Sequence, residues 1–195
     1  MYKINDKDEL KNLILSGKIN NENSSSYDIS NLTDLSYLFK NCFMLKEVPF
    51  MDFSNVRNAE GMFAGCVSLK EVPDLEFTKA TNLKNLFLGC SNLKKVPYLE
   101  TSSALNIDSM FEGCKSLHAV PFLDFANVVH CNYLFKDCEN LKYLPNIDLS
   151  YVEFANSIFE GCGALNIIPI INHNQYEDYE LEVFFGNSDY THLNH

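Results

Sequence analysis

The sequence predicts an α/β solenoid of six 24-residue coils, and three repeated positions predict it. A phenylalanine recurs every 24 residues, at Phe39, Phe63, Phe87, Phe111, Phe135 and Phe159. A cysteine stands three residues after each of them, at Cys42, Cys66, Cys90, Cys114, Cys138 and Cys162. A proline follows in every unit, at Pro49, Pro73, Pro97, Pro121, Pro145 and Pro169. A fixed period of this length indicates stacked units that bury a continuous core between neighbours.

Composition limits the classes of partner. The net charge of −11 argues against a nucleic-acid backbone or an anionic membrane as the main partner. No apolar run has the length of a membrane span, and residues 1–9 lack the apolar stretch of a signal peptide. We therefore expect a protein that stays in the cytosol or is exported by another route, unless a leader has been removed.

Residues 1–26 are expected to form an N-terminal capping helix followed by a loop. Asp6 and Glu9 have the spacing of a capping box, and Gly17 is suited to end the helix. Three apolar side chains share one helical face: Leu10, Leu13 and Ile14. That face can cover the open end of the array, as the terminal units of solenoids do.

Residues 27–171 are expected to form the solenoid, with short parallel strands on one face and short helical turns on the other. Apolar residues at i, i+3, i+6 and i+7 predict the helical turn, as in Val56, Ala59, Met62 and Phe63. Ser or Thr stands two residues before most of these stripes and is expected to cap the turn: Ser30, Ser54, Thr78, Ser102 and Ser150.

The strand is expected between a left-handed corner and the proline. The residue before each repeated cysteine tolerates a left-handed backbone, so we expect a positive φ at Asn41, Gly65, Gly89, Gly113, Asp137 and Gly161. A short strand such as residues 69–72 follows, and the proline ends it because proline cannot donate a ladder hydrogen bond.

Residues 172–195 are expected to form a degenerate C-terminal capping repeat. Residues 183–190 align with residues 86–93, which places Phe184 in the phenylalanine slot and Asn187 in the cysteine slot. Stacked cysteines could lie within disulfide reach or form a thiolate metal ladder. The asparagine favours a third interpretation, in which the cysteines are free, buried side chains whose weak S–H groups face the backbone.

No catalytic set is evident. The histidines are scattered, and nucleotide-binding, hydrolase and zinc-protease motifs are missing from the sequence. We expect no cofactor and no metal. An enzyme with a site in the C-terminal segment, around His173, Asp178 and His192, is the least favoured alternative.

Three rows of residues could form a binding surface. They are an acidic row (Asp52, Glu76, Glu100, Asp124 and Asp148, with Asn172 next in line), a basic row (Lys46, Lys70, Lys94, His118 and Lys142) and a mixed row (Phe50, Asp74, Tyr98, Phe122, Asn146 and Ile170). Exposed slots that vary between coils build extended binding surfaces. The alternatives are ordinary solvated faces with aromatic side chains folded inward, or a calcium-binding acidic ladder, which lacks the usual Gly-x-Asp pattern. We expect partner contacts at Phe50, Asp74, Lys94, Tyr98, Glu100, His118, Phe122 and Asp124.

The repeat closely resembles the BspA-type leucine-rich repeats of bacteria, and residues 62–80 carry the pattern: Met62-Phe63-Ala-Gly-Cys66-Val-Ser-Leu69-Lys-Glu-Val72-Pro73 and onward to Ala80. The resemblance covers roughly residues 27–171 and implies a leucine-rich-repeat solenoid without catalytic residues. Family members of this kind are surface or secreted proteins that bind host or matrix proteins, or adhesive modules of phage and cell-surface proteins. We therefore expect a monomeric, non-enzymatic module that binds a protein; the alternative is an architectural or self-assembling spacer.

Overall fold

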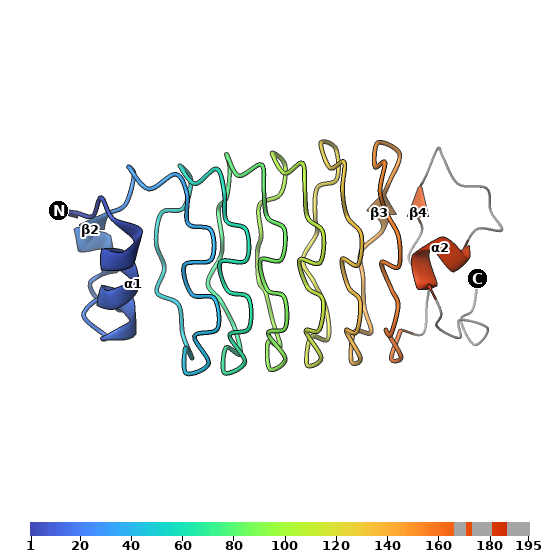
Figure 1. Ribbon diagram of the computed structural model, residues 1–195, viewed down its shortest axis with the longest axis horizontal. Helices are drawn as coiled ribbons and strands as arrows, with labels where there is room; N and C mark the ends of the chain where they lie inside the picture. Colours follow the sequence, from blue (N-terminus) through green and yellow to red (C-terminus); the bar gives the residue numbers. More distant parts are fainter. Residues whose placement is uncertain (166–170, 173–180, 187–195) are drawn as a thin grey trace.

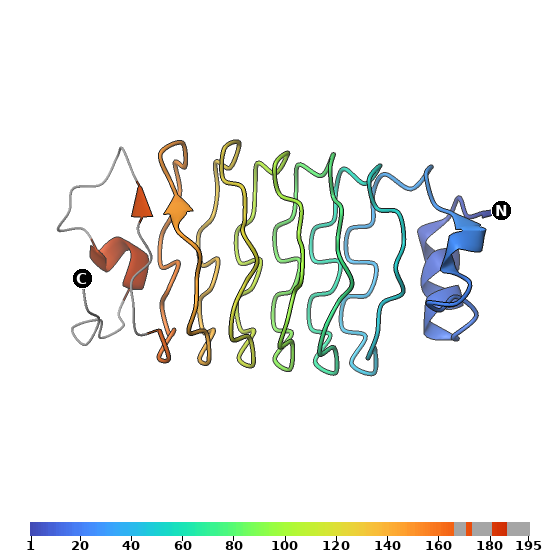
Figure 2. The same ribbon diagram turned by 180° about the vertical axis from the view of Figure 1, so that it is seen from behind.

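The computed structural model describes residues 1–165, 171–172 and 181–186. The coils lie side by side along the long axis of the molecule (Figures 1 and 2). Helix α1 (Lys7–Leu15) lies at one end of the array, and helix α2 (Leu181–Phe185) lies at the other. Every coil between them therefore has a neighbour on each side.

Helix α1 forms where the sequence predicts it. The Asp6 side chain caps it by accepting a 2.8 Å hydrogen bond from the Asp8 N–H, and Gly17 follows the helix with φ +73°. Leu10 and Ile14 are buried and belong to the core of the array. The capping box is not closed, because Glu9 instead accepts a hydrogen bond from the hydroxyl of Tyr2.

Short parallel pairings join the coils on the side that carries the repeated proline, and single parallel bridges such as Asn58 with Asn82 join them on the other side. Strand β1 (Tyr2–Lys3) pairs with β2 (Tyr27–Asp28), just after the 3-10 turn η1 (Ser24–Ser26), and β3 (Ile147–Asp148) pairs with β4 (Ile171–Asn172). Single parallel bridges link other coils at the 24-residue register: Glu71 with Lys95, Leu75 with Leu99, and Ala119 with Tyr143. The bridges at Glu71 and Ala119 precede the repeated proline, where the sequence predicts the strand. The bridge at Leu75 and the pairing of β3 with β4 follow it, so the proline does not end the pairing as expected.

The other side of each coil is not the helical turn that the apolar stripe suggests. Alternate N–H groups donate to the next coil, as in Phe39 N to Met62 O (2.8 Å) and Asn41 N to Ala64 O (2.7 Å). The N–H groups between them close tight turns, as in Cys42 N to Phe39 O (2.9 Å). Between Tyr27 and Leu165 the described chain contains no α-helix. Neighbouring coils satisfy the backbone along this whole side, so no helix has to be nucleated.

Two left-handed corners per coil shape this side. Positive φ values occur at all six positions predicted for them: Asn41, Gly65, Gly89, Gly113, Asp137 and Gly161. A second set, four residues earlier, was not predicted: Tyr37, Gly61, Asn85, Ser109, Tyr133 and Ser157. A residue with positive φ cannot continue a right-handed helix, which explains why the stripe does not form one. At Gly61 a Cβ atom would also lie 2.6 Å from the Tyr37 ring.

A column of phenylalanine rings fills the core. The rings of Phe39, Phe63, Phe87, Phe111, Phe135 and Phe159 follow one another at centroid distances of 5.5–6.0 Å and are almost parallel. Phe185 continues the column, 5.4 Å from Phe159. The alignment that placed Phe184 in this slot is therefore wrong by one residue. Phe159 N donates to Phe184 O, as Phe39 N donates to the residue before Phe63.

The repeated cysteines are free, and their thiols donate to the backbone as expected. Each Sγ lies 3.0–3.2 Å from the carbonyl oxygen of a core phenylalanine in the previous coil: Cys66 to Phe39, Cys90 to Phe63, Cys114 to Phe87, Cys138 to Phe111 and Cys162 to Phe135. Burial raises the pKa of Cys66 and of Cys162 to about 12. The thiols therefore stay protonated and bind the coils together. Asn187 lies outside the described residues.

Candidate partner-binding face

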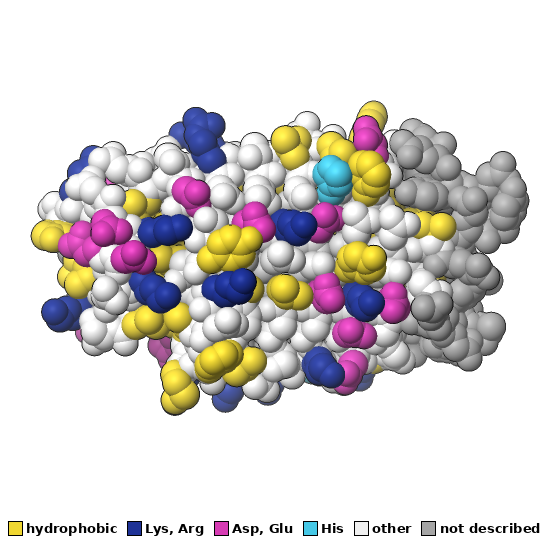
Figure 3. Space-filling view, in the orientation of Figure 1, with side chains coloured by type: hydrophobic (Ala, Val, Ile, Leu, Met, Phe, Trp, Pro, Cys, Tyr) yellow, Lys and Arg dark blue, Asp and Glu magenta, His cyan; other side chains and the backbone are white. Residues whose placement is uncertain are grey.

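Three neighbouring rows form the candidate site, and we call them the exposed strip: Lys46, Lys70, Lys94, His118 and Lys142; Phe50, Asp74, Tyr98, Phe122 and Asn146; Asp52, Glu76, Glu100, Asp124 and Asp148. The parallel bridges place equivalent residues of successive coils beside one another. Of the eight predicted contact residues, Glu100 and Asp124 are half-buried and the other six are exposed. Figure 3 shows the side of the array that faces the viewer in Figure 1, where hydrophobic, basic and acidic side chains are interspersed; strand β3, which carries Asp148 of the strip, lies on the far side of that view.

The aromatic side chains of the mixed row point outward. Phe50 is 54% exposed, Tyr98 43% and Phe122 70%, whereas the core phenylalanines are essentially inaccessible. The alternative in which these rings fold inward is therefore excluded. Burial of such an exposed apolar side chain against a partner would contribute favourable free energy to binding.

The acidic row has a structural role that the sequence analysis missed. In four of its five members, one carboxylate oxygen accepts the N–H two residues later at 2.9–3.0 Å: Asp52 from Ser54, Glu100 from Ser102, Asp124 from Ala126 and Asp148 from Ser150. Asp28, 24 residues before Asp52, accepts from Ser30 in the same way at 2.8 Å. The turn is thus capped by the acidic side chain and not by the Ser or Thr hydroxyl. Hydrogen bonds from Ser54 lower the pKa of Asp52, and those from Ser150 lower that of Asp148. An acid two residues before a Ser is the signal for such a turn.

Two predicted contact residues are joined directly. The Tyr98 hydroxyl donates a 2.7 Å hydrogen bond to Glu100 Oε2, while Glu100 Oε1 accepts from the Ser102 N–H. The bond raises the pKa of Tyr98 and lowers that of Glu100. Since both carboxylate oxygens are used, this coil presents an oriented phenol ring beside a fixed negative charge.

Phe122 and Asp124 are brought together at one hollow. Its volume is about 360 Å³, and Asn146, Asp148 and Tyr151 also line it. The backbone of Asp124 is held by the buried Thr101 of the previous coil, whose hydroxyl accepts from Asp124 N (2.7 Å) and donates to Asp124 O (3.0 Å). Two exposed aromatic rings, those of Phe122 and Tyr151, therefore stand beside two carboxylates.

The remaining predicted contacts do not join this hollow. Phe50 lies near the N-terminal loop, where its N–H donates to Asn21 Oδ1 at 3.1 Å. Asp74 and Lys94 are exposed members of the strip, and their side chains make no hydrogen bond or ion pair within the described residues. His118 donates from Nδ1 to the carbonyl oxygen of Ser116 at 2.7 Å, which fixes the tautomer.

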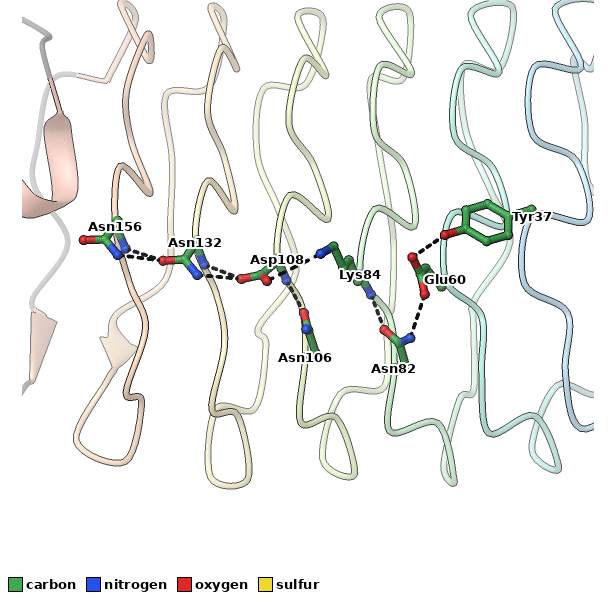
Figure 4. Close-up of polar contacts among 8 residues, drawn as sticks. All are labelled: Tyr37, Glu60, Asn82, Lys84, Asn106, Asp108, Asn132 and Asn156. Carbon is green, nitrogen blue, oxygen red and sulfur yellow. Dashed lines mark hydrogen bonds and ion pairs between the residues drawn. The ribbon is translucent and has the colours of Figure 1, made fainter.

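A polar ladder lies on the side of the coils opposite the exposed strip, and the sequence analysis did not predict it (Figure 4). Asn156 donates to Asn132 Oδ1, and Asn132 donates to Asp108 Oδ1, each through its backbone and side-chain amide. Further along, Asn82 Nδ2 donates to Glu60 Oε2, and the Tyr37 hydroxyl donates to Glu60 Oε1. Because neighbouring coils satisfy these groups, the ladder holds the array together and is not a candidate ligand site.

In the described residues no group of His, Cys, Asp and Glu is placed to hold a metal ion, and no helix is both long and apolar enough to cross a membrane. The C-terminal alternative site rested on His173, Asp178 and His192. These three residues lie outside the part of the chain that the structure describes.

Stacked 24-residue coils with short parallel pairings, a buried aromatic column and a ladder of buried S–H donors define a leucine-rich-repeat protein. The chain belongs to the BspA type leucine-rich repeat region family: the family model matches residues 31–142 and 129–194 with six copies. Neither a curated protein nor a solved structure gave a match.

Proposed function

We propose that this protein is a non-catalytic module that binds another protein along the exposed strip. One observation carries the proposal: the side chains of the mixed row change from coil to coil, while the two charged rows beside it and the core beneath it repeat. The mixed row runs Phe50, Asp74, Tyr98, Phe122 and Asn146, above an unbroken column of phenylalanines. A constant core with a variable outer row is how repeat proteins build a specific binding surface.

The chemistry of the strip supports a protein partner. Exposed aromatic side chains surrounded by charge are enriched at the centres of protein interfaces, where each can contribute a large share of the binding free energy. Full burial of a ring such as Phe122 contributes roughly 1.5–3 kcal/mol. The fixed charges of Asp52, Glu100 and Asp148 can set the register of the partner.

The buried thiols support a non-catalytic role. Burial raises the pKa of Cys66 to about 12, and its Sγ donates to Phe39 O. A cysteine nucleophile needs a lowered pKa and an adjacent base, and neither is found at this buried column. The resemblance to the family implies, more specifically, an adhesive module that binds a host or matrix protein.

Affinity capture tests the proposal. Immobilised protein is incubated with host-cell extract, and the retained proteins are compared among wild type, a Tyr98→Ala/Phe122→Ala double variant and Leu105→Ser. Leu105 is exposed but lies outside the strip, so it serves as the matched control. We expect a protein that wild type and the control retain and the double variant loses. Equal retention by all three, with unchanged melting temperatures, would contradict the proposal.

A further inference from the structure

The hollow between the fourth and fifth coils combines apolar walls with negative charge. Phe122 is 70% exposed and Tyr151 is 71% exposed, and both rings line it together with Asp124 and Asp148. None of its lining residues is basic. A ligand in the hollow would therefore meet two ring surfaces and two carboxylates, and none of the described lining residues neutralises the negative charge.

The two carboxylates are fixed in place. Asp124 Oδ1 accepts the Ala126 N–H at 2.9 Å, and Asp148 Oδ1 accepts the Ser150 N–H at 3.0 Å. The backbone N–H of each turn bonds to one carboxylate oxygen, and the Ser150 side chain adds a hydrogen bond to Asp148. Because the turns are part of the coil, the acceptors need no rearrangement before a ligand arrives.

We propose that this hollow receives an arginine side chain of the protein partner. The inference rests on the proposed function and names the group that the strip recognises. A guanidinium group is planar and weakly hydrated, stacks on aromatic faces and donates several N–H groups to carboxylates. The rings of Phe122 and Tyr151 suit the stacking of a guanidinium plane, and the carboxylates of Asp124 and Asp148 suit its N–H donors.

Other cations fit the hollow less well. A quaternary ammonium group can stack on the rings but has no N–H to offer the two carboxylates. A hard metal ion needs several oxygen ligands around one point, and two aromatic walls provide none. A lysine ammonium is a strongly hydrated point charge, so it gains less from the rings than a guanidinium does.

Nuclear magnetic resonance of the full chain can test this. The probe is a short acetylated and amidated peptide with one central arginine, compared with the same peptide carrying lysine or citrulline, and with tetramethylammonium chloride. The amide signals of Ala126 and Ser150 report on the hollow, since these N–H groups are bonded to its carboxylates. The Ser54 amide, bonded to Asp52 in a coil that does not line the hollow, is the matched reference.

We expect the arginine peptide to shift the Ala126 and Ser150 signals at lower concentration than the lysine peptide, and citrulline to leave them unmoved. Phe122→Ala or Tyr151→Ala should weaken binding about fivefold. Asp148→Asn should weaken it similarly, because the amide oxygen can still cap the turn but the charge is gone. Tyr143→Ala removes an equally exposed ring that does not line the hollow and should change nothing.

Equal shifts with citrulline or with tetramethylammonium, or unchanged binding in Phe122→Ala, would overturn the arginine assignment. If the peptides fail but a Tyr98→Ala single variant still loses the captured protein, the hollow is not the recognition point and the strip remains the binding surface. If that variant loses nothing either, the proposed function falls as well.

Discussion

The hydroxyl of Tyr98 and a carboxylate oxygen of Glu100 lie 2.7 Å apart on the exposed strip, and the same carboxylate caps the turn at Ser102. The Glu100 side chain thus both caps a turn of the coil and holds an exposed aromatic ring. The stability of the coil and the orientation of a candidate contact residue are coupled at this position.

The titration of Tyr98 should depend on Glu100. The hydrogen bond to Glu100 raises the pKa of Tyr98, because ionising the phenol would place a second negative charge beside the carboxylate. Glu100→Gln should therefore lower the pKa of Tyr98, measured from its ring carbon signal as pH rises. Tyr37, whose pKa is raised by Glu60 in the same way, should be unaffected and provides the control. An unchanged Tyr98 would show that the bond does not persist in solution.

Stability should fall on the acid side. Hydrogen bonds in the turns lower the pKa of Asp28, Asp52 and Asp148 below the usual value for Asp. The hydrogen bond from Tyr98, followed by those from Ser102, lowers the pKa of Glu100 below the usual value for Glu. Groups with a lowered pKa in the folded state contribute stability above the pKa of the unfolded state and lose it as pH falls through the folded value. The melting temperature should therefore drop progressively below about pH 4.5.

Asp52→Asn is the variant that isolates this effect, because it keeps an acceptor for the Ser54 N–H but cannot titrate. Its melting temperature should fall less steeply with acid than that of wild type. Equal slopes would assign the acid sensitivity to other carboxylates.

Loss of a central ring should be costly. Phe111 stacks on Phe87 at 5.5 Å and on Phe135 at 5.7 Å, with no exposed surface. Phe111→Ala should lower the free energy of unfolding by roughly 3–5 kcal/mol, because it opens a cavity between two coils. Urea denaturation measures this. Phe122→Ala, at an exposed position, should stay within about 0.5 kcal/mol of wild type.

Thiol reactivity should separate the cysteines. Cys66, Cys90, Cys114, Cys131, Cys138 and Cys162 are buried, and Cys42 is half-buried. Burial raises the pKa of thiols such as Cys66 and Cys162 to about 12. A thiol reagent at neutral pH should therefore label Cys42 first in the native protein. After denaturation without reductant, all seven cysteines should react. A count near one would mean disulfides and would contradict the S–H ladder.

The features predicted well from sequence were those that a single side-chain property determines. Phenylalanine at a fixed period predicts a stacked core, and Gly, Asn or Asp before each cysteine predicts a left-handed corner. The sequence left open whether Tyr98 and Phe122 fold inward, and their exposure is known only from the structure.

The features that sequence did not predict depend on contacts between coils. The second left-handed corner is occupied by Tyr or Ser in four coils and by Gly61 and Asn85 in the other two, and Tyr and Ser do not indicate such a backbone. The apolar stripe therefore suggested a helix where the neighbouring coil satisfies the N–H groups. The hollow at Phe122 was not visible either, because it joins residues of two coils.

The S–H ladder repeats one bond between every pair of coils, from Cys66 on Phe39 to Cys162 on Phe135. A single inserted residue would break this bond, the ring column and the polar ladder of Figure 4 between two neighbouring coils. Adding or removing a whole coil would break none of them. Duplication of entire units is thus the step by which such an array can lengthen, and each new unit brings a fresh outer row whose residues can diverge without disturbing what lies beneath.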